Sequence, residues 1–341
     1  MSESGSFRAT AREYRGIGTI AIVLAIAPFF LIGPGMTHQA QILTTFLLFA
    51  ILTVALNIAF GHTNQLFLFV GALMGVGAYA TAIPADNFGI SPWFLLPASA
   101  LTAGVLGLLV SYVSARRGMT VIVIAILTLA LQLAFEQAFE GARGLTGGTT
   151  GFHFSGLEVD LLTDSLGMSS HVAHYYVVLV FLLGALALYQ WMMHSKYGLA
   201  YKAIRQDEIA AEAVGIDVVR YKVVAGFTAA AIIGLTGPLY GQLGNWIVPS
   251  DFTFQTIDVM VLVMLVLGGM RTLAGPVVGA ALIIYINEQL QGVGQWRTAV
   301  FGLLLIVLFL YFREGIVPKA RELWHHDRGR AYAGAIRDRL S

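Results

Sequence analysis

The sequence predicts an all-α polytopic membrane protein of about ten transmembrane segments. Hydrophobic residues make up 57% of its 341 residues and charged residues only 11%, and between residues 17 and 115 the sole formal charge is Asp86. A soluble domain of this size would still need a polar shell. The apolar runs match the roughly 20 helical residues that cross a hydrocarbon core about 30 Å thick. They lack the alternation of apolar and polar residues that is typical of a membrane β-barrel.

The apolar runs define the spans in chain order. We predict helices at residues 17–33, 38–60, 65–83, 92–114, 119–139, 172–192, 223–242, 257–270, 275–290 and 297–312. The first run follows three arginines as a signal peptide would, but Pro28 would directly follow the cleavage site, so we predict a retained helix. The eighth and ninth runs are short and glycine-rich, which is typical of broken or re-entrant segments.

The distribution of basic residues predicts the orientation. All Lys and Arg residues except Arg143 and Arg297 fall in residues 1–16, 115–118, 193–222, 271–274 and 313–341. Short loops rich in Lys and Arg stay on the cytoplasmic side. We therefore expect a multi-pass protein of the cell membrane with both termini in the cytoplasm. Its predicted parts are an N-terminal tail (1–16), a transmembrane domain (17–312) with a cytoplasmic loop at 193–222, and a basic tail (313–341).

Five spans in each half imply that the second half has the opposite orientation, as in the inverted repeats of many transporters. Glycines in the third, eighth and ninth spans are expected mainly to allow close helix packing. These glycines are Gly71, Gly75, Gly77, Gly268, Gly269, Gly275 and Gly279. The Gly275-Pro276 pair is expected to break a helix inside the membrane.

Several classes of chemistry are excluded or disfavoured by the sequence. The chain has no cysteine, which excludes disulfides and thiolate chemistry, and no Ser/His/Asp constellation indicates a catalytic site. His171 and His174 lack a third metal ligand in the sequence nearby. The bases form no aromatic-interleaved patch, so no nucleic-acid partner is predicted. No glycine is followed by lysine, which excludes a Walker loop, so an ATP-driven process would need a separate ATPase chain.

The carboxylates bear on the alternative of an ion-driven carrier. Such a carrier is expected to place ionisable residues in mid-membrane. Glu136, Glu140, Asp258 and Glu288 are all predicted near interfaces, as end-of-helix groups. This pattern disfavours a stand-alone carrier but does not exclude that hypothesis.

The stretch YKAIRQDEIAAEAVGI, residues 201–216, concentrates charge in a chain that otherwise avoids it. Residues 203–214 are predicted to form one short helix with an apolar stripe at Ala203, Ala210 and Val214 and a C-terminal stop at Gly215. A helix of this length is marginal in water. A partner groove would explain both its stripe and its charge, whereas a solvated surface helix is the simpler alternative.

The charged stretch and its surroundings resemble the branched-chain amino acid permease family of ABC importers, in particular its M-type membrane subunit. The resemblance rests on SKYGLAYKAIRQDEIAAEAVGIDVVRYKVVAGFTAAAIIGLTGPLYG (195–241), LTGGTTG (145–151) and GGMRTLAGPVVGAAL (268–282), and runs over about residues 40–312. The coupling residues that it implies are Ala203, Arg205, Asp207, Glu208, Ala210, Ala211, Glu212 and Gly215. The substrate-path residues that it implies are Gly61, Asn64, Gln65, Phe67, Thr146, Gly147, Gly148, Thr149 and Thr150.

The resemblance also implies partners. These are a second, homologous permease chain, two ATPase subunits that carry ATP and magnesium, an external solute-binding protein and membrane lipid; no cofactor or metal is expected in this chain. Such a subunit is a transporter component and not an enzyme.

The chain departs from the family at several positions. Asn64, Phe67 and Phe69 stand where Gly, Ser and Gly are usual, and Arg271 stands at an expected Gly. Thr149-Thr150 stands where a Ser-Asp or similar polar pair is common. These departures leave the substrate open among branched-chain amino acids, other amino acids, urea, a short amide or an organic acid. A stand-alone carrier or a passive channel for a small solute also remains as an alternative function.

Overall fold

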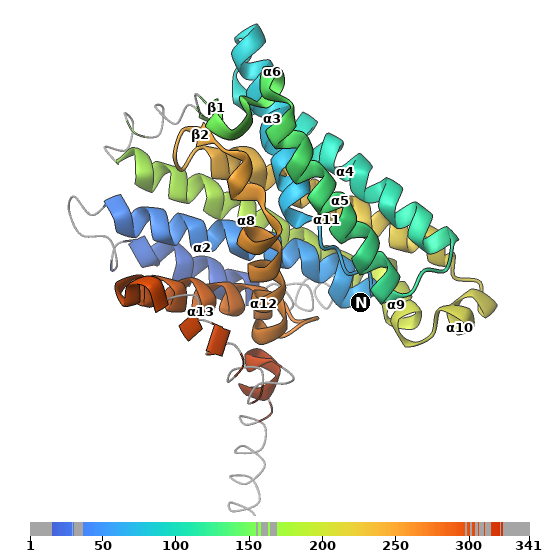
Figure 1. Ribbon diagram of the computed structural model, residues 1–341. Helices are drawn as coiled ribbons and strands as arrows, with labels where there is room; N and C mark the ends of the chain where they lie inside the picture. The colour runs from blue at the N-terminus through green and yellow to red at the C-terminus, as the bar shows by residue number, and fades with distance from the viewer. Residues whose placement is uncertain are drawn as a thin grey trace, which may run out of the picture.

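The computed structural model describes residues 16–28, 30, 37–154, 156–157, 163, 169–296, 299–300, 302–303, 306, 310, 315–320 and 322. In the described part of the chain, helices are joined by short connections, and two short strands form a single ribbon (Figure 1). This arrangement confirms the predicted all-α membrane fold.

Five helices are long and apolar enough to span a membrane. They are α2 (Thr37–Leu56, extended by the π-turn η1, Asn57–Gly61), α4 (Pro92–Arg116), α5 (Val121–Gly141), α8 (Ser170–His194) and α11 (Val218–Gly241). Each corresponds to a predicted span. The most apolar window of α2 is 83% buried, whereas that of α5 is only 17% buried. The helix α2 therefore forms the centre of the domain, and α5 lies at its surface.

The remaining apolar helices are shorter. They are Gly16–Pro28, α3 (Val70–Phe88), α12 (Val259–Gly268, preceded by the π-turn η4, Phe254–Asp258) and α13 (Gly275–Gln289, followed by η5, Leu290–Trp296). The helices α12 and α13 have ten and fifteen residues, as the short eighth and ninth runs predicted. Pro276 lies at the start of α13, and residues 269–274 separate this helix from α12. The helix is therefore interrupted here, but the location of this break inside the membrane stays a prediction. The predicted span at 297–312 lies largely outside the described residues, as do most residues of both predicted tails.

The connections gather at two opposite ends of the bundle (Figure 1). At one end, called here the ribbon end, α6 (Arg143–Thr146), η2 (Gly148–Thr150) and η3 (Pro249–Phe252) lie beside the antiparallel strands β1 (Phe152–His153) and β2 (Trp246–Ile247). At the other end, called here the loop end, lie α9 (Lys196–Gln206) and α10 (Glu208–Ala213). The ribbon joins the segment that follows α5 to the segment that follows α11.

Glycines bring the backbones of several helices together. A Cβ atom at Gly77 of α3 would overlap the carbonyl group of Gly234 in α11, and one at Gly107 of α4 would meet Gly226 and Ala230 of α11. Small residues allow this close approach wherever membrane helices pack. The packing role expected for the glycines of the third span is confirmed for Gly77, and α3, α4 and α11 form one closely packed unit. The inverted repeat stays a prediction.

Candidate functional site

The charged stretch at the loop end forms two helices, so the prediction of one helix over residues 203–214 was wrong. The helix α9 ends at Gln206, and Asp207 adopts an extended backbone with φ of −161°. Its Oδ1 atom accepts the backbone N–H groups of Ile209 at 2.9 Å and Ala210 at 3.0 Å. An aspartate that caps a new helix in this way ends the preceding one.

The end of α10 is as predicted. Gly215 has φ of +86°, and its N–H donates to the Glu212 carbonyl oxygen at 2.9 Å. A glycine in the left-handed region is the usual residue directly after a helix.

The break at Asp207 changes which residues of α10 face outward. Ala211 is buried against Ile204 and Val218 in a small core of its own. Ile209 is 80% exposed and Val214 is 76% exposed. The exposed apolar surface of α10 consists of Ile209, Ala210, Ala213 and Val214, and we call it the α10 face.

The α10 face differs from the predicted stripe, because Ala203 lies half-buried on α9. Sequence reasoning missed Ile209, which a helix start at Glu208 would have revealed. Of the other predicted coupling residues, Arg205 is half-buried, and Asp207 and Glu212 are exposed. Burial raises the pKa of the Tyr201 phenol on α9 above its ordinary value.

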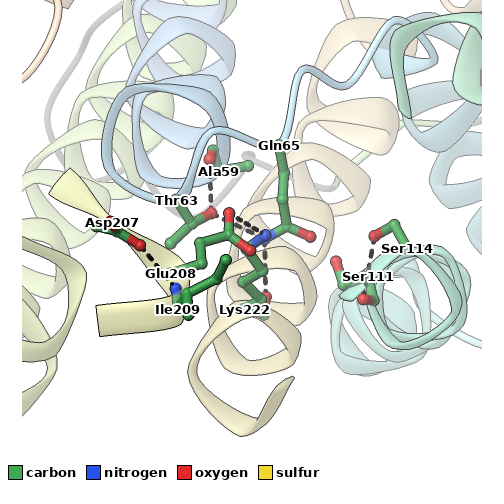
Figure 2. A network of polar contacts seen from close by, with 9 residues as sticks. All are labelled: Ala59, Thr63, Gln65, Ser111, Ser114, Asp207, Glu208, Ile209 and Lys222. Carbon is green, nitrogen blue, oxygen red and sulfur yellow. Dashed lines mark hydrogen bonds and ion pairs between the residues drawn. The ribbon is translucent and has the colours of Figure 1, made fainter. Parts of the chain in front are cut away.

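Glu208 joins α10 to α11. Its Oε1 atom lies 2.6 Å from the Nζ atom of Lys222, whose side chain is 2% exposed, whereas that of Glu208 is 38% exposed. The Lys222 carbonyl oxygen accepts a hydrogen bond of 3.0 Å from the Gln65 side-chain amide (Figure 2). Gln65 belongs to residues 62–69, the segment between η1 and α3, which we call the connector.

The side chains of the connector alternate between two sides. Gln65, Phe67 and Phe69 are buried, and the two rings make an edge-to-face contact at 5.1 Å. The residues that alternate with them are Asn64, Leu66 and Leu68, which are half-exposed. Alternation of this kind is typical of an extended backbone. Phe67, predicted to line the substrate path, therefore faces the core in this structure, and its role in the path stays a prediction.

Neighbouring helices hold the connector through two backbone groups and one side chain. The Thr128 hydroxyl of α5 accepts the Leu68 N–H at 3.0 Å and donates to the Leu66 carbonyl oxygen at 3.2 Å. His62, at the other end, contacts the Tyr189 hydroxyl of α8 at 2.9 Å. Non-helical backbone at membrane depth requires partners of this kind.

The start of α3 is held by buried side chains. Asp258, which is 1% exposed, accepts the N–H groups of Val70 at 2.6 Å and Gly71 at 3.2 Å. The Gln132 side chain of α5 accepts the Ala72 N–H at 2.7 Å. The first N–H groups of a helix have no partners within that helix, and a carboxylate also suits the positive end of the helix dipole.

Asp258 stands at a helix end, as predicted, because it is the last residue of η4 and directly precedes α12. Its side chain is buried and also caps α3, and its position near a membrane interface stays a prediction. The neighbouring Glu136 also accepts two hydrogen bonds, from Gln132 at 2.9 Å and from the Phe254 N–H at 2.6 Å. Both carboxylates are occupied in holding the backbone.

Two departures from the family pattern have a common structural explanation. Asn64 has φ of +56° and Arg271 has φ of +66°. Both are in the left-handed region, where glycine is the usual residue and asparagine the most tolerated alternative. The Arg271 side chain donates to the Gly61 carbonyl oxygen at 2.8 Å, and its backbone N–H donates to the Asn57 side chain at 2.8 Å. The arginine thus fastens η1 to the turn between α12 and α13.

The small-residue loop at 144–151 lies at the ribbon end. Thr146 is buried, and its hydroxyl donates to the Phe139 carbonyl oxygen at 2.6 Å. Thr149 and Thr150 are exposed, and Gly147 and Gly148 have positive φ angles. The loop is therefore built from defined turns.

The two groups of predicted path residues are not brought together. Thr146 contacts α5 at Phe139, whereas the connector contacts the same helix at Thr128. These positions are about 16 Å apart along α5.

A polar cavity is lined by the two histidines for which the sequence predicts no metal site. His171 and His174 face a cavity of about 80 Å³ between α2, α8 and α11. Its other lining residues are Gln41, Thr44, Ser170, Gln242, Leu243 and Asn245. Within the described ranges, no three side chains of His, Asp or Glu gather closely enough to hold a metal ion.

Comparison with known proteins places the chain among transport proteins. Residues 39–312 match the family described as "Branched-chain amino acid transport system / permease component". The high-affinity branched-chain amino acid transport system permease protein LivM of Salmonella typhimurium LT2 is 26% identical over 321 residues, which cover 88% of this chain and 74% of LivM. LivM of Escherichia coli K12 is 27% identical with the same coverage.

A third relative comes from another organism. The "Probable branched-chain amino acid transport permease protein LivH" of Methanocaldococcus jannaschii is 26% identical over 284 residues, which cover 80% of this chain and 84% of LivH. No solved structure matches the chain significantly. The family match spans well over half of the sequence, and the chain belongs to the permease-component family of branched-chain amino acid transport systems.

Proposed function

We propose that this chain is the membrane subunit of an ATP-driven importer that moves a small polar solute, a branched-chain or related amino acid. The family match and the names of the relatives support the solute class. The observation that carries the ATP-driven mechanism is the α10 face. Ile209 on the six-residue helix α10 and Val214 directly after it are large apolar residues that stand exposed.

The α10 face suits a protein groove. The inner side of α10 is held by the small core of Ala211, Ile204 and Val218. A partner can therefore contact the outer side without any unfolding of α10. Asp207 and Glu212 border this face with negative charge. Apolar contacts at the centre of an interface supply most of its affinity, and charged residues at the rim mainly tune encounter and specificity. The partner that we propose is an ATPase subunit, which binds ATP and magnesium.

The orientation follows from this assignment. The loop end faces the cytoplasm, where the basic loop residues also place it, and both termini lie on that side. The ribbon end faces outward and receives the solute from an external binding protein at Thr149 and Thr150. A second, homologous permease chain completes the pathway. Closure of the ATPases moves α10 and alternates access between the two ends.

The test is a substitution on the α10 face with matched controls. Ile209→Arg places a charge at the centre of the proposed contact, and we expect loss of ATPase co-purification with normal membrane insertion. Gln291→Arg adds the same charge at an exposed position after α13 and should leave co-purification intact. Ala211→Arg overfills the internal core and should instead destabilise the loop end itself. ATPase binding at the normal level by Ile209→Arg would remove the main support for the proposal.

A further inference from the structure

Lys222 is the residue at which α10 and the connector meet. Its side chain binds α10 through Glu208, and its backbone carbonyl binds the connector through Gln65 (Figure 2). The ammonium group is nearly inaccessible to solvent, and the salt bridge is short. Removal of one partner from a buried ion pair leaves an uncompensated charge, which is costly. Displacement of Glu208 therefore has to move Lys222 with it or break this contact.

The connector carries such a displacement toward the start of α3. From Gln65 the extended backbone runs past Thr128, which binds it at two points, to the Asp258 carboxylate at the start of α3. Only four residues lie between Gln65 and Val70. A chain segment reaches at most about 3.3–3.6 Å per residue, so a displacement of Gln65 beyond the reach of this short segment has to move the start of α3.

The nitrogen of the Gln65 side-chain amide is hydrogen-bonded, whereas its oxygen has no partner among the described residues. Its Nε2 atom donates to the Lys222 carbonyl oxygen and, at 2.8 Å, to the Thr63 hydroxyl, whose own proton goes to the Ala59 carbonyl oxygen. Both neighbours are acceptors, which determines the orientation of the amide. Its Oε1 atom is buried, and among the described residues it has no hydrogen-bond partner. Such a group calls for an explanation, because buried polar atoms are rarely unpaired.

We propose that Glu208, Lys222 and Gln65 are positioning residues that transmit movement of α10 to the connector and so to the start of α3. This inference rests on the proposed function, since it requires α10 to be moved by an ATPase. In this mechanism, the ion pair makes α10 and the base of α11 move together. The Gln65 amide moves with Lys222. Its unpaired Oε1 atom gains a hydrogen-bond partner in the other access state of the transporter.

The experiment uses the complete transporter in proteoliposomes with its binding protein. For Lys222→Met we expect a normally assembled complex, basal ATP hydrolysis within about twofold of wild type, and solute uptake per ATP hydrolysed lowered about tenfold, a typical coupling effect. Lys202→Met removes an exposed lysine from α9 and serves as the matched control, with unchanged uptake. The exchange Glu208→Lys with Lys222→Glu restores the pair and should recover most of the uptake.

A purely structural role of Lys222 would give a different result. If Lys222→Met prevents assembly, Gln65→Leu decides the question, because it breaks the link without burying an unpaired charge. For Gln65→Leu we expect less solute taken up per ATP hydrolysed at saturating solute, with an unchanged KM for the solute. A raised KM with an unchanged uptake per ATP would overturn the proposal, because it would assign Gln65 to solute binding alone. Normal uptake in an assembled Lys222→Met transporter would also overturn it, whereas loss of ATPase binding by Ile209→Arg concerns only the proposed function.

Discussion

Asp258 provides the sharpest test of how the start of α3 is held. Its two oxygens accept the N–H groups of Val70 at 2.6 Å and Gly71 at 3.2 Å, and its side chain is buried. Hydrogen bonds to charged groups contribute about 1.5–3 kcal/mol each. Asp258→Ala loses both bonds and should lower the free energy of unfolding by about 3–6 kcal/mol. Asp258→Asn keeps a single acceptor oxygen and should cost about half as much.

The assay is reversible unfolding of the purified chain in mixed micelles at increasing denaturant concentration. Asp86→Asn is the matched control, because Asp86 lies exposed on the same helix α3. A surface change of this kind is expected to stay within about 0.5 kcal/mol. If Asp258→Ala and Asp86→Asn unfold at the same denaturant concentration, the carboxylate does not hold α3, and our explanation of the helix start is refuted.

Two further predictions concern helix packing and the ribbon end. Gly77→Ala places a methyl group against the Gly234 carbonyl, and we expect a loss of about 1–3 kcal/mol in stability. Gly184→Ala, where a Cβ meets no atom within 4 Å, should be neutral or slightly stabilising in the same denaturant-unfolding assay. Thr149→Trp adds bulk at an exposed loop position and should lower uptake several-fold in an intact complex; uptake at the wild-type rate would show that the loop takes no part in solute delivery.

Much of the helical framework was predictable because span length and hydrophobicity are local properties. The five long spans, the short glycine-rich helices and the stop at Gly215 are all found. The break at Asp207 was missed because Ala203 and Ala210 fit a single helical period. The capping ability of an aspartate between two helical stretches was the available signal.

The contacts of the candidate site were less predictable because they join residues far apart in the sequence. Asp258 and Val70 are 188 positions apart, and Glu208 and Lys222 meet only because α10 folds back on α11. The positive φ angles at Asn64 and Arg271, by contrast, were within reach of the sequence. Both residues replace a glycine expected from the family, and glycine is the residue most often required in that region.

The contact between Asp258 and α3 also bears on how the protein is made. A ribosome adds about 5–20 residues per second, so the acceptor appears roughly 10–40 s after the N–H groups that it serves, because 188 residues separate them. During that interval the start of α3 lacks its final partner, and unpaired backbone groups are costly in lipid. The start of α3 can form these hydrogen bonds only after residue 258 has been synthesised. The native arrangement of the third helix is a late event of biogenesis, completed only after most of the chain has been synthesised.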